Sequence, residues 1–458
     1  MTYLSKMNIR YIISSCLLTV AAVAAAQLPQ NSGGLYAELA ADTVTDGSSA
    51  EIRIDPVIET IDADNGFGRV DYSPYPFVNL AANHIDLNGA DWCGVAAAFR
   101  RAAIEPVTVV HIGDSHIQAD GATEVTRRLL QRRYGNGGRG FIAPLKLAGT
   151  NEPMNYKLTS TSQWKTARLL KQPWGVDMQF SGVAIAPESG RFDLTVDTET
   201  LRSPADPFNT IRIFTGDVVV KVDSVACNSQ PVEFGTSEGE GVTEVRLPRS
   251  VDAATLYMSA PPGAVIAGVE LLNGNGGVVY SAIGNNGAAF SSYDGLRVGE
   301  RIAQMHPALV VLSMGTNEAF GNMSAAQMRL NIDRLVGEIK EANPDAAILL
   351  VTPQECDKRV AGRRKKRRAR RSYFTVNTSV ARMRDVIADY GRDNHIAVYD
   401  YFTVTGGDGS TKKWVGAGLF GRDHIHLNWT GYALMGQLLG DAIADAVKNG
   451  CDGQQGKN

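Results

Sequence analysis

Cysteine, net charge and long apolar runs are all scarce in this sequence, and each scarcity excludes a class of protein. The 458 residues include five cysteines. Those beyond the N-terminal segment are far apart and have no C-x-x-C spacing, so neither a zinc site nor a disulfide pairing can be deduced; they are Cys93, Cys227, Cys356 and Cys451. The formal net charge is −3, so the protein as a whole has no electrostatic preference for a polyanion, and no nucleic-acid partner is expected.

The apolar stretch near the N-terminus is too short to span a membrane. Lys6 and Arg10 open it, residues 11–23 are mostly apolar, and residues 24–26 are alanines. A spanning helix needs ~18–20 apolar residues, whereas a basic, then apolar, then small-residue order is typical of a cleaved signal peptide. We expect residues 1–26 to be a signal peptide. The mature protein is then exported, periplasmic or extracellular in a bacterium, with no transmembrane span after cleavage.

The rest of the chain divides by its hydrophobic periodicity. Residues 27–80 are rich in Gly, Asp, Ser and Pro and are expected to form a tether with irregular packing. In residues 81–154 and 273–450, β-branched apolar runs alternate with helical stripes, which predicts a parallel sheet covered on both faces. Between them, residues 155–272 alternate at period two and predict an inserted antiparallel β-sandwich. The fold class is α/β, with strands expected at Val107–Ile112, Gly277–Ile283, Ala308–Met314, Ala346–Thr352 and His395–Asp400.

Two local patterns within the α/β part give further expectations. A helix is predicted over Glu124–Tyr134, and Ser324 with Gln327 predicts the capped start of another. Residues 135–140 are mostly glycine, but their spacing fits neither a P-loop nor a G-x-G-x-x-G motif after a strand. We interpret this glycine-rich stretch as a flexible rim loop.

Polar residues follow several of the predicted strands, where ligands bind in open α/β sheets. Ser115 comes directly after the first strand, Gly287 after the second and Asn317 after the third, while Asp423 and His426 precede the last helix. Each of these is by itself typical of an ordinary turn, cap or surface position. Together they supply every group that an acyl-transfer site needs.

The chemistry assigns a role to each residue. Ser115 is the nucleophile, because a serine hydroxyl attacks once a neighbouring base takes its proton. His426 is that base, and Asp423 holds its imidazole in the correct tautomer. The backbone N–H groups of Ser115 and Gly287 and the side-chain amide of Asn317 form the oxyanion hole. No cofactor or metal is needed.

Four short motifs in this order resemble the sequence blocks of the SGNH (GDSL-type) hydrolases. Gly113-Asp114-Ser115 resembles the first block and Gly287 ends the second. Gly315-x-Asn317 resembles the third, and Asp423-x-x-His426 resembles the last. The resemblance implies a three-layer α/β hydrolase domain and the Ser-His-Asp mechanism described above, with Asp114 shaping the turn.

Two departures from the general pattern narrow the resemblance. His116 stands where many members have leucine, and Glu318 where many have aspartate. Both are similar to the branch that contains the bacterial peptidoglycan O-acetylesterases, which also carries a carbohydrate-module-like β-sandwich insertion. The resemblance therefore implies an exported serine esterase whose partner is an acetylated polysaccharide, either peptidoglycan or another envelope or dietary glycan.

Other interpretations of the same residues remain open. The enzyme could be an O-acyltransferase, or a lipase or thioesterase with a larger apolar pocket. It could also be a glycan-binding envelope protein with vestigial activity. His424 competes with His426 as the base, although the family spacing favours His426. A metal site made of His116, Asp423 and His424 lacks the usual ligand spacing, and His111 is expected to be a core residue.

A basic tract, Lys358–Arg371, stands apart from the balanced charge of the chain. Ten of its fourteen residues are Lys or Arg. The expected signal peptide argues against a nuclear role, and a solvated loop is the default interpretation. Because the tract follows a predicted strand, it should emerge at the edge of the sheet that holds the site. We hypothesise that it attracts an anionic polymer or lipid headgroups to the site.

Overall fold

The computed structural model describes residues 69–200, 203–361 and 372–449. All of them fall within one compact unit, Val57–Asn458. The expected signal peptide, most of the tether and most of the basic tract lie outside the described residues. Within the described residues, no helix combines the length and apolar character needed to cross a membrane.

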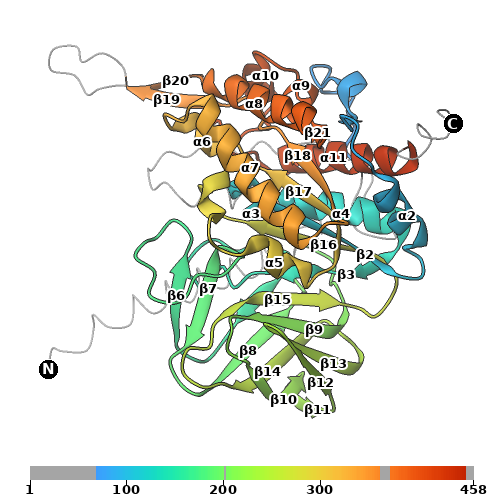
Figure 1. Cartoon of the computed structure of the whole chain (residues 1–458), viewed down its shortest axis with the longest axis vertical. Helices are drawn as coiled ribbons and strands as arrows, with labels where there is room; N and C mark the ends of the chain where they lie inside the picture. Colours follow the sequence, from blue (N-terminus) through green and yellow to red (C-terminus); the bar gives the residue numbers. More distant parts are fainter. Residues whose placement is uncertain (1–68, 201–202, 362–371, 450–458) are drawn as a thin grey trace, which may run out of the picture. The chain divides into compact units, whose positions relative to one another are not determined.

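A mixed, mostly parallel sheet forms the centre of the fold (Figure 1). Its strand order is β1-β21-β18-β17-β2-β16-β3. Only β1 is antiparallel to its neighbour. The strands are β1 Ile85–Asp86, β2 Pro106–Gly113, β3 Asn136–Gly138, β16 Gly277–Gly284, β17 Pro307–Ser313, β18 Ala347–Val351 and β21 Ala397–Tyr399. The five strands predicted for the α/β part are all present, and the parallel-sheet prediction is confirmed.

Strand β2 is central, and its side chains alternate between two hydrophobic cores. Val107 and Val109 belong to one core, while Val110 and Ile112 belong to the other. This alternation is expected because successive side chains of a strand point to opposite faces. The residues from Val107 to Gly113 are all buried, as is typical of a parallel strand covered on both sides.

Helices cover both faces of the central sheet. One core includes residues of α2 Cys93–Arg101, α4 Gly121–Tyr134 and α11 Trp429–Asn449. The other includes residues of α5 Val298–Ala303, α7 Ala325–Ala342 and α8 Ser379–Asp393. Helix α7 begins as predicted, with the Ser324 hydroxyl accepting a hydrogen bond from the Gln327 amide at 3.1 Å. The short helices are η2 Leu80–Ala82, α3 Ser115–Gln118, η3 Phe290–Tyr293, α6 Thr316–Phe320, α9 Tyr401–Val404 and α10 Ser410–Gly416.

The predicted antiparallel strands form two further sheets. One has the order β12-β13-β9-β15-β7-β6, with β4 also paired to β15, and the other has the order β11-β10-β14-β8-β5. The first comprises β4 Gly140–Ile142, β6 Trp164–Arg168, β7 Val183–Pro187, β9 Phe208–Thr215, β12 Gly235–Gly239, β13 Val242–Val251 and β15 Ile266–Leu272. The second comprises β5 Lys157–Thr159, β8 Arg191–Asp197, β10 Lys221–Cys227, β11 Gln230–Val232 and β14 Ala253–Ser259.

These antiparallel sheets share a core with the central sheet. Leu194 of β8, Ile213 of β9 and Val269 of β15 belong to the same buried cluster as Val110 and Ile112 of β2. The antiparallel part therefore packs directly on the central sheet. The antiparallel character of this stretch is confirmed, whereas its description as a separate sandwich domain stays a prediction.

The glycine-rich stretch is structured, so its interpretation as a flexible rim loop is wrong. It supplies the whole of the edge strand β3 and the first residue of β4, which pairs with β15. Gly138 has φ +136°, and a Cβ there would lie 2.5 Å from the Leu271 carbonyl oxygen. Glycine is required because two backbones approach closely, which only a residue without a side chain permits.

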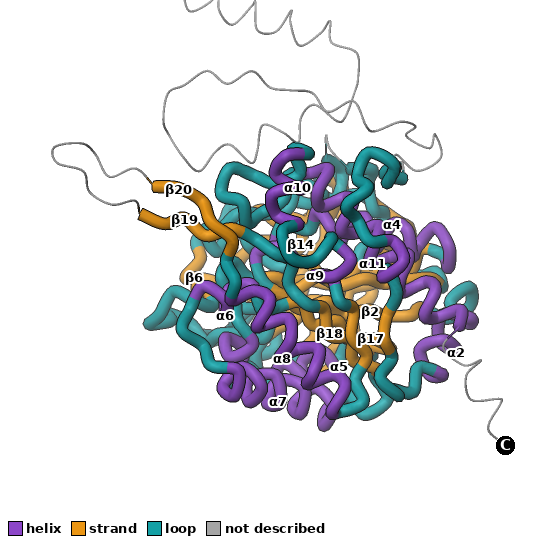
Figure 2. The backbone as a smooth tube through the Cα atoms, turned by 90° about the horizontal axis from the view of Figure 1, so that it is seen from above, coloured by secondary structure: helices purple, strands orange, loops and turns teal. Residues whose placement is uncertain are grey.

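A two-stranded hairpin projects from the rest of the described residues (Figure 2). It pairs β19 Asp357–Ala361 with β20 Ser372–Val376 in antiparallel register. The described part of the basic tract lies on β19, and the remainder, residues 362–371, lies outside the described residues.

Candidate active site

Ser115 occupies the turn between β2 and α3. Strand β2 ends at Gly113, and Asp114 caps α3 by accepting a hydrogen bond from the His116 amide at 2.9 Å. A Cβ on Gly113 would lie 2.6 Å from the Ser313 carbonyl oxygen of the neighbouring strand. The backbone can therefore turn this sharply only with glycine at this position, and the turn leaves Ser115 beyond the carboxyl end of the strand.

Three of the predicted site residues form a hydrogen-bonded line. The Ser115 hydroxyl oxygen lies 2.8 Å from His426 Nε2. His426 Nδ1 lies 2.6 Å from Asp423 Oδ2. The other carboxylate oxygen of Asp423 accepts backbone hydrogen bonds from Ile425 and His426, each at 3.0 Å. Because an ionised carboxylate only accepts, Nδ1 carries the proton, and Nε2 is free to accept the serine proton.

The electrostatics of this line favour an ionised acid and a basic imidazole. Burial raises the pKa of Asp423, but the hydrogen bond from His426 and the backbone donors outweigh burial and lower that pKa to about 2. Burial lowers the pKa of His426, but the hydrogen bond and charge of Asp423 outweigh burial, so the pKa is raised above its usual value. Asp423 is therefore charged throughout the physiological pH range, and His426 gains basicity from it.

The predicted oxyanion donors lie on the two neighbouring loops. Gly287 follows β16 and has φ +81°. Asn317 lies in the first turn of α6, and its amide Nδ2 donates to the Ala288 carbonyl at 2.9 Å and to Asp114 Oδ2 at 3.3 Å. Asn317 thus links Ala288, which follows Gly287, to Asp114, which precedes Ser115. The structure brings the predicted donors to the same edge of the sheet.

Glu318 and Gln118 hold these loops, and sequence reasoning missed both roles. The Glu318 carboxylate accepts from the Phe290 amide at 2.8 Å and from the Gly315 amide at 3.0 Å. Gln118 Oε1 accepts from the Asn286 amide at 2.7 Å. Both side chains are buried. The departure from aspartate at 318 was the available signal, because a longer side chain can reach two loops.

Asp114, which is buried, and His116, which is partly exposed, flank Ser115 in the sequence. Burial raises the pKa of Asp114 to about 7. Burial, together with the neighbouring charge of His426, lowers the pKa of His116 to about 3. The Tyr432 hydroxyl lies 3.2 Å from His116 Nδ1, and the His116 and His426 rings lie 5.3 Å apart. His116 is therefore neutral near pH 7 and does not compete with His426 for a proton.

The remaining histidine candidates have other partners. His424 Nδ1 lies 2.8 Å from Asp357 Oδ2, and its ring stacks on Phe374 at 4.0 Å. His111 is buried, with Tyr280 and Ser313 hydroxyls at its two ring nitrogens. Among the residues that the structure describes, no group of three or more His, Cys, Asp or Glu side chains is arranged to hold a metal ion.

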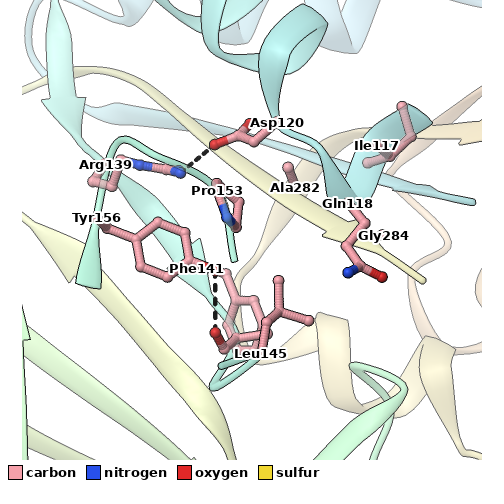
Figure 3. Close-up of a pocket in the computed structure, with 11 residues that line it drawn as sticks. Ile117, Gln118, Asp120, Arg139, Phe141, Leu145, Pro153, Tyr156, Ala282 and Gly284 are labelled. Carbon is pink, nitrogen blue, oxygen red and sulfur yellow. Dashed lines mark hydrogen bonds and ion pairs between the residues drawn. The ribbon is translucent and has the colours of Figure 1, made fainter. Parts of the chain in front are cut away.

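Two cavities near Ser115 are small, and neither is lined by Ser115 or His426. One, of about 20 Å³, is lined by residues that include Ile117 and Gln118 of α3 and Asp120, Arg139 and Phe141 (Figure 3). The other, of about 30 Å³, is lined by residues that include Asp114, His116, Met314 and Gln354. Both are far below the roughly 300–1,000 Å³ of pockets that enclose large ligands. Neither has room for a long acyl chain.

Comparison with known proteins gives one family and several structures. The sequence profile of the GDSL-like lipase/acylhydrolase family matches residues 262–434. A solved peptidoglycan O-acetylesterase aligns with 81% of this chain and 98% of its own, with 21% identity and a TM-score of 0.63. An acetylxylan esterase from Geobacillus stearothermophilus aligns with 37% of this chain and 73% of its own, with 16% identity and a TM-score of 0.28. No curated protein matches the chain.

The matched range leaves out the first motif. It contains Gly287, Asn317, Asp423 and His426 and begins well after Ser115. The antiparallel strands β5 to β14 separate Ser115 from the other motifs along the chain. In space the pairing of β2 with β16 brings them back together.

Proposed function

We propose that this carboxylic ester hydrolase of the GDSL type removes acetyl groups from an O-acetylated polysaccharide, with Ser115 as nucleophile, His426 as base and Asp423 as orienting acid. The family match confirms the predicted relation to the SGNH hydrolases and the class of reaction. The observation that carries the assignment of residues is the hydrogen-bonded line from the Ser115 hydroxyl through His426 to Asp423.

The reaction follows from this line. Ser115 Oγ attacks the acetyl carbonyl carbon while His426 Nε2 takes its proton, and Asp423 stabilises the imidazolium. The backbone N–H groups of Ser115 and Gly287 and the Asn317 amide stabilise the oxyanion. The C–O bond to the sugar then breaks, and His426 returns the proton to the sugar oxygen. Water, deprotonated by His426, then attacks the acetyl-serine. Its C–O bond to Ser115 Oγ breaks, His426 returns the proton to Oγ, and acetate leaves.

Asn317 has a donor available for the oxyanion. Its contact with Asp114 is 3.3 Å long, against 2.9 Å for its bond to Ala288. Longer hydrogen bonds are weaker, so the hydrogen shared with Asp114 is the one that we expect to turn toward a developing negative charge. Loss of one such donor typically costs about 100- to 1,000-fold in rate.

The fold comparison supports an acetyl group on a glycan as the substrate. The two cavities described above, which Ser115 and His426 do not line, could not hold a long acyl chain. The peptidoglycan O-acetylesterase with the same fold acts, by its name, on an acetylated glycan. Peptidoglycan or another envelope or dietary glycan is therefore the proposed substrate, and an exported enzyme would meet it. Transfer of the acetyl group to a sugar hydroxyl uses the same residues.

Acetate release from polymers tests the proposal. We expect the protein to release acetate from O-acetylated peptidoglycan, and Ser115→Ala to release none above buffer. Acetylated xylan serves as the comparison polymer. Activity on long-chain p-nitrophenyl esters that exceeds activity on p-nitrophenyl acetate would contradict the acetyl assignment. Appearance of newly acetylated oligosaccharide in place of free acetate would identify a transferase.

A further inference from the structure

The β19–β20 hairpin, called the arm below (residues 357–361 and 372–376), is fastened to the loop that carries His426. The Asp357 amide donates to the His424 carbonyl at 3.1 Å. The Asp357 carboxylate bonds the His424 ring at 2.8 Å, and Phe374 stacks on that ring at 4.0 Å and 20°. His424 lies two residues before His426. The arm therefore begins directly beside the proposed base.

The other end of the arm is fastened to α6. Asn377, which follows β20, is buried. Its side chain donates to the Ala319 carbonyl at 3.0 Å, and its backbone amide donates to the Cys356 carbonyl at 2.9 Å. Because α6 also carries Asn317, the base of the arm joins the oxyanion side of the site to the His426 side. Both views show the arm beside α6 (Figures 1 and 2).

Exposed aromatic rings gather at the arm. Of the aromatic side chains that are clearly exposed within the described ranges, Tyr373 and Phe374 lie on the arm and Phe320 ends α6, while only Tyr257 lies elsewhere. Tyr373 is 56% exposed and Phe320 is 44% exposed. A soluble surface rarely concentrates large rings without a function, and flat aromatic faces pack well against the C–H faces of sugar rings.

The arm also carries two cations, Lys358 and Arg359. Neither Lys358 nor Arg359 forms an ion pair with the described residues. Arg359 donates to the Ser372 hydroxyl at 2.6 Å. Arg359 lies opposite Phe374 in the register, and Lys358 lies on the face that carries Tyr373. The face away from His424 thus combines Lys358 with Tyr373, and this pairing of a cation with an exposed ring complements a polymer that bears carboxylates.

We propose that the arm binds a carboxylate-bearing glycan chain and holds its acetylated sugar at Ser115. This proposal rests on the proposed esterase function and specifies its substrate class. The rings contact sugar faces, and Lys358 and Arg359 pair with carboxylates along the chain. Because the arm is joined to both sides of the site, a chain held on it lies close to the nucleophile.

The test uses the double variant Lys358→Ala/Tyr373→Ala, because both side chains lie on the face of the arm away from His424. Tyr257→Ala, on β14 and 47% exposed, is the matched control. Binding is measured by co-sedimentation with peptidoglycan sacculi from which the acetyl groups have been removed. The carboxylates of these sacculi are either left free or amidated. All proteins carry Ser115→Ala for this assay. We expect the double variant to weaken binding about tenfold, and amidation to weaken binding of the parent similarly.

A second measurement separates binding from catalysis. In proteins with Ser115 intact, we expect kcat/KM for p-nitrophenyl acetate to stay within twofold for the arm variant, while kcat/KM for acetylated peptidoglycan falls about tenfold through KM. Unchanged sacculus binding, or an equal loss for Tyr257→Ala, would overturn the proposal. Arm-dependent binding to phosphatidylglycerol vesicles but not to sacculi would assign the arm to membranes and also overturn it. If the arm-dependent binding holds but no polymer loses acetate, the esterase proposal fails, while glycan binding by the arm stands without its link to catalysis.

Discussion

Replacing Glu318 is the sharpest test of how the site is held together. Its carboxylate is 2% exposed. One oxygen accepts from the Phe290 amide after β16, and the other accepts from the Gly315 amide before α6. Both amides are buried, and the side chain lies one residue from Asn317. Glu318→Ala removes both acceptors at once.

The expected loss of stability follows from the number of backbone N–H groups that the substitution leaves without a hydrogen-bond acceptor. A buried donor that loses its partner costs about 1–3 kcal/mol, so two unpaired N–H groups cost about 2–6 kcal/mol in the free energy of unfolding. Glu318→Gln keeps one acceptor and faces the other amide with a donor, so we expect about half that loss. Because the loops carrying Gly287 and Asn317 are then free to shift, kcat for p-nitrophenyl acetate should fall about 100-fold in Glu318→Ala, with a smaller change in KM.

Urea unfolding and steady-state kinetics on the same variants check both numbers. Glu338→Ala is the matched control. The Glu338 carboxylate, on α7, also accepts from a backbone amide, that of Gly299 at 3.1 Å, but this hydrogen bond does not involve the loops that carry Gly287 and Asn317. The control variant should lose stability without losing kcat. Two results would refute the proposed role of Glu318 in holding the two loops. One is a loss of unfolding free energy below about 1 kcal/mol in Glu318→Ala, and the other is a fall in kcat no larger than that of the control.

Three further predictions concern the groups around Ser115. Asp423 raises the pKa of His426. Because only neutral His426 accepts a proton, kcat/KM should fall as pH drops through that pKa. Asp423→Ala should move this fall to lower pH and lower the value that kcat/KM reaches at high pH. Gln118→Ala leaves the Asn286 amide without its acceptor, and we expect kcat for p-nitrophenyl acetate to fall about tenfold or more. An unchanged kcat would show that the loop carrying Asn286 and Gly287 keeps its conformation without Gln118. Asp357→Asn weakens the hold on the His424 ring and should lower polymer turnover more than small-ester turnover; equal losses would contradict this.

The α/β strands and the polar motifs at their ends were predictable because both signals are local. A run such as Val107–Ile112 is apolar throughout, and the turn to Ser115 follows it directly. The start of α4 was harder to place: the helix begins at Gly121, before the predicted Glu124, after Asp120 adopts a left-handed conformation.

Features that depend on distant neighbours were not predictable from the sequence. The glycines of residues 135–140 pack against backbone more than 100 positions later, which no local pattern indicates. Likewise, periodicity shows that a strand has one buried face but not what covers it. The core shared by Leu194 and Val110 is therefore visible only in three dimensions, as are the partners of Glu318 and Gln118.

Hydrolysis of p-nitrophenyl acetate by the wild-type protein and by Ser115→Ala tests the central claim most directly. If Ser115 is the nucleophile, removal of its hydroxyl should lower kcat at least about a thousandfold, because activated-nucleophile sites lose most of their rate acceleration with that group. The same variant should fold normally, since the hydroxyl bonds only His426 among the residues that the structure describes. Equal rates in the two proteins, both above buffer, would contradict the account and place the chemistry elsewhere in the chain.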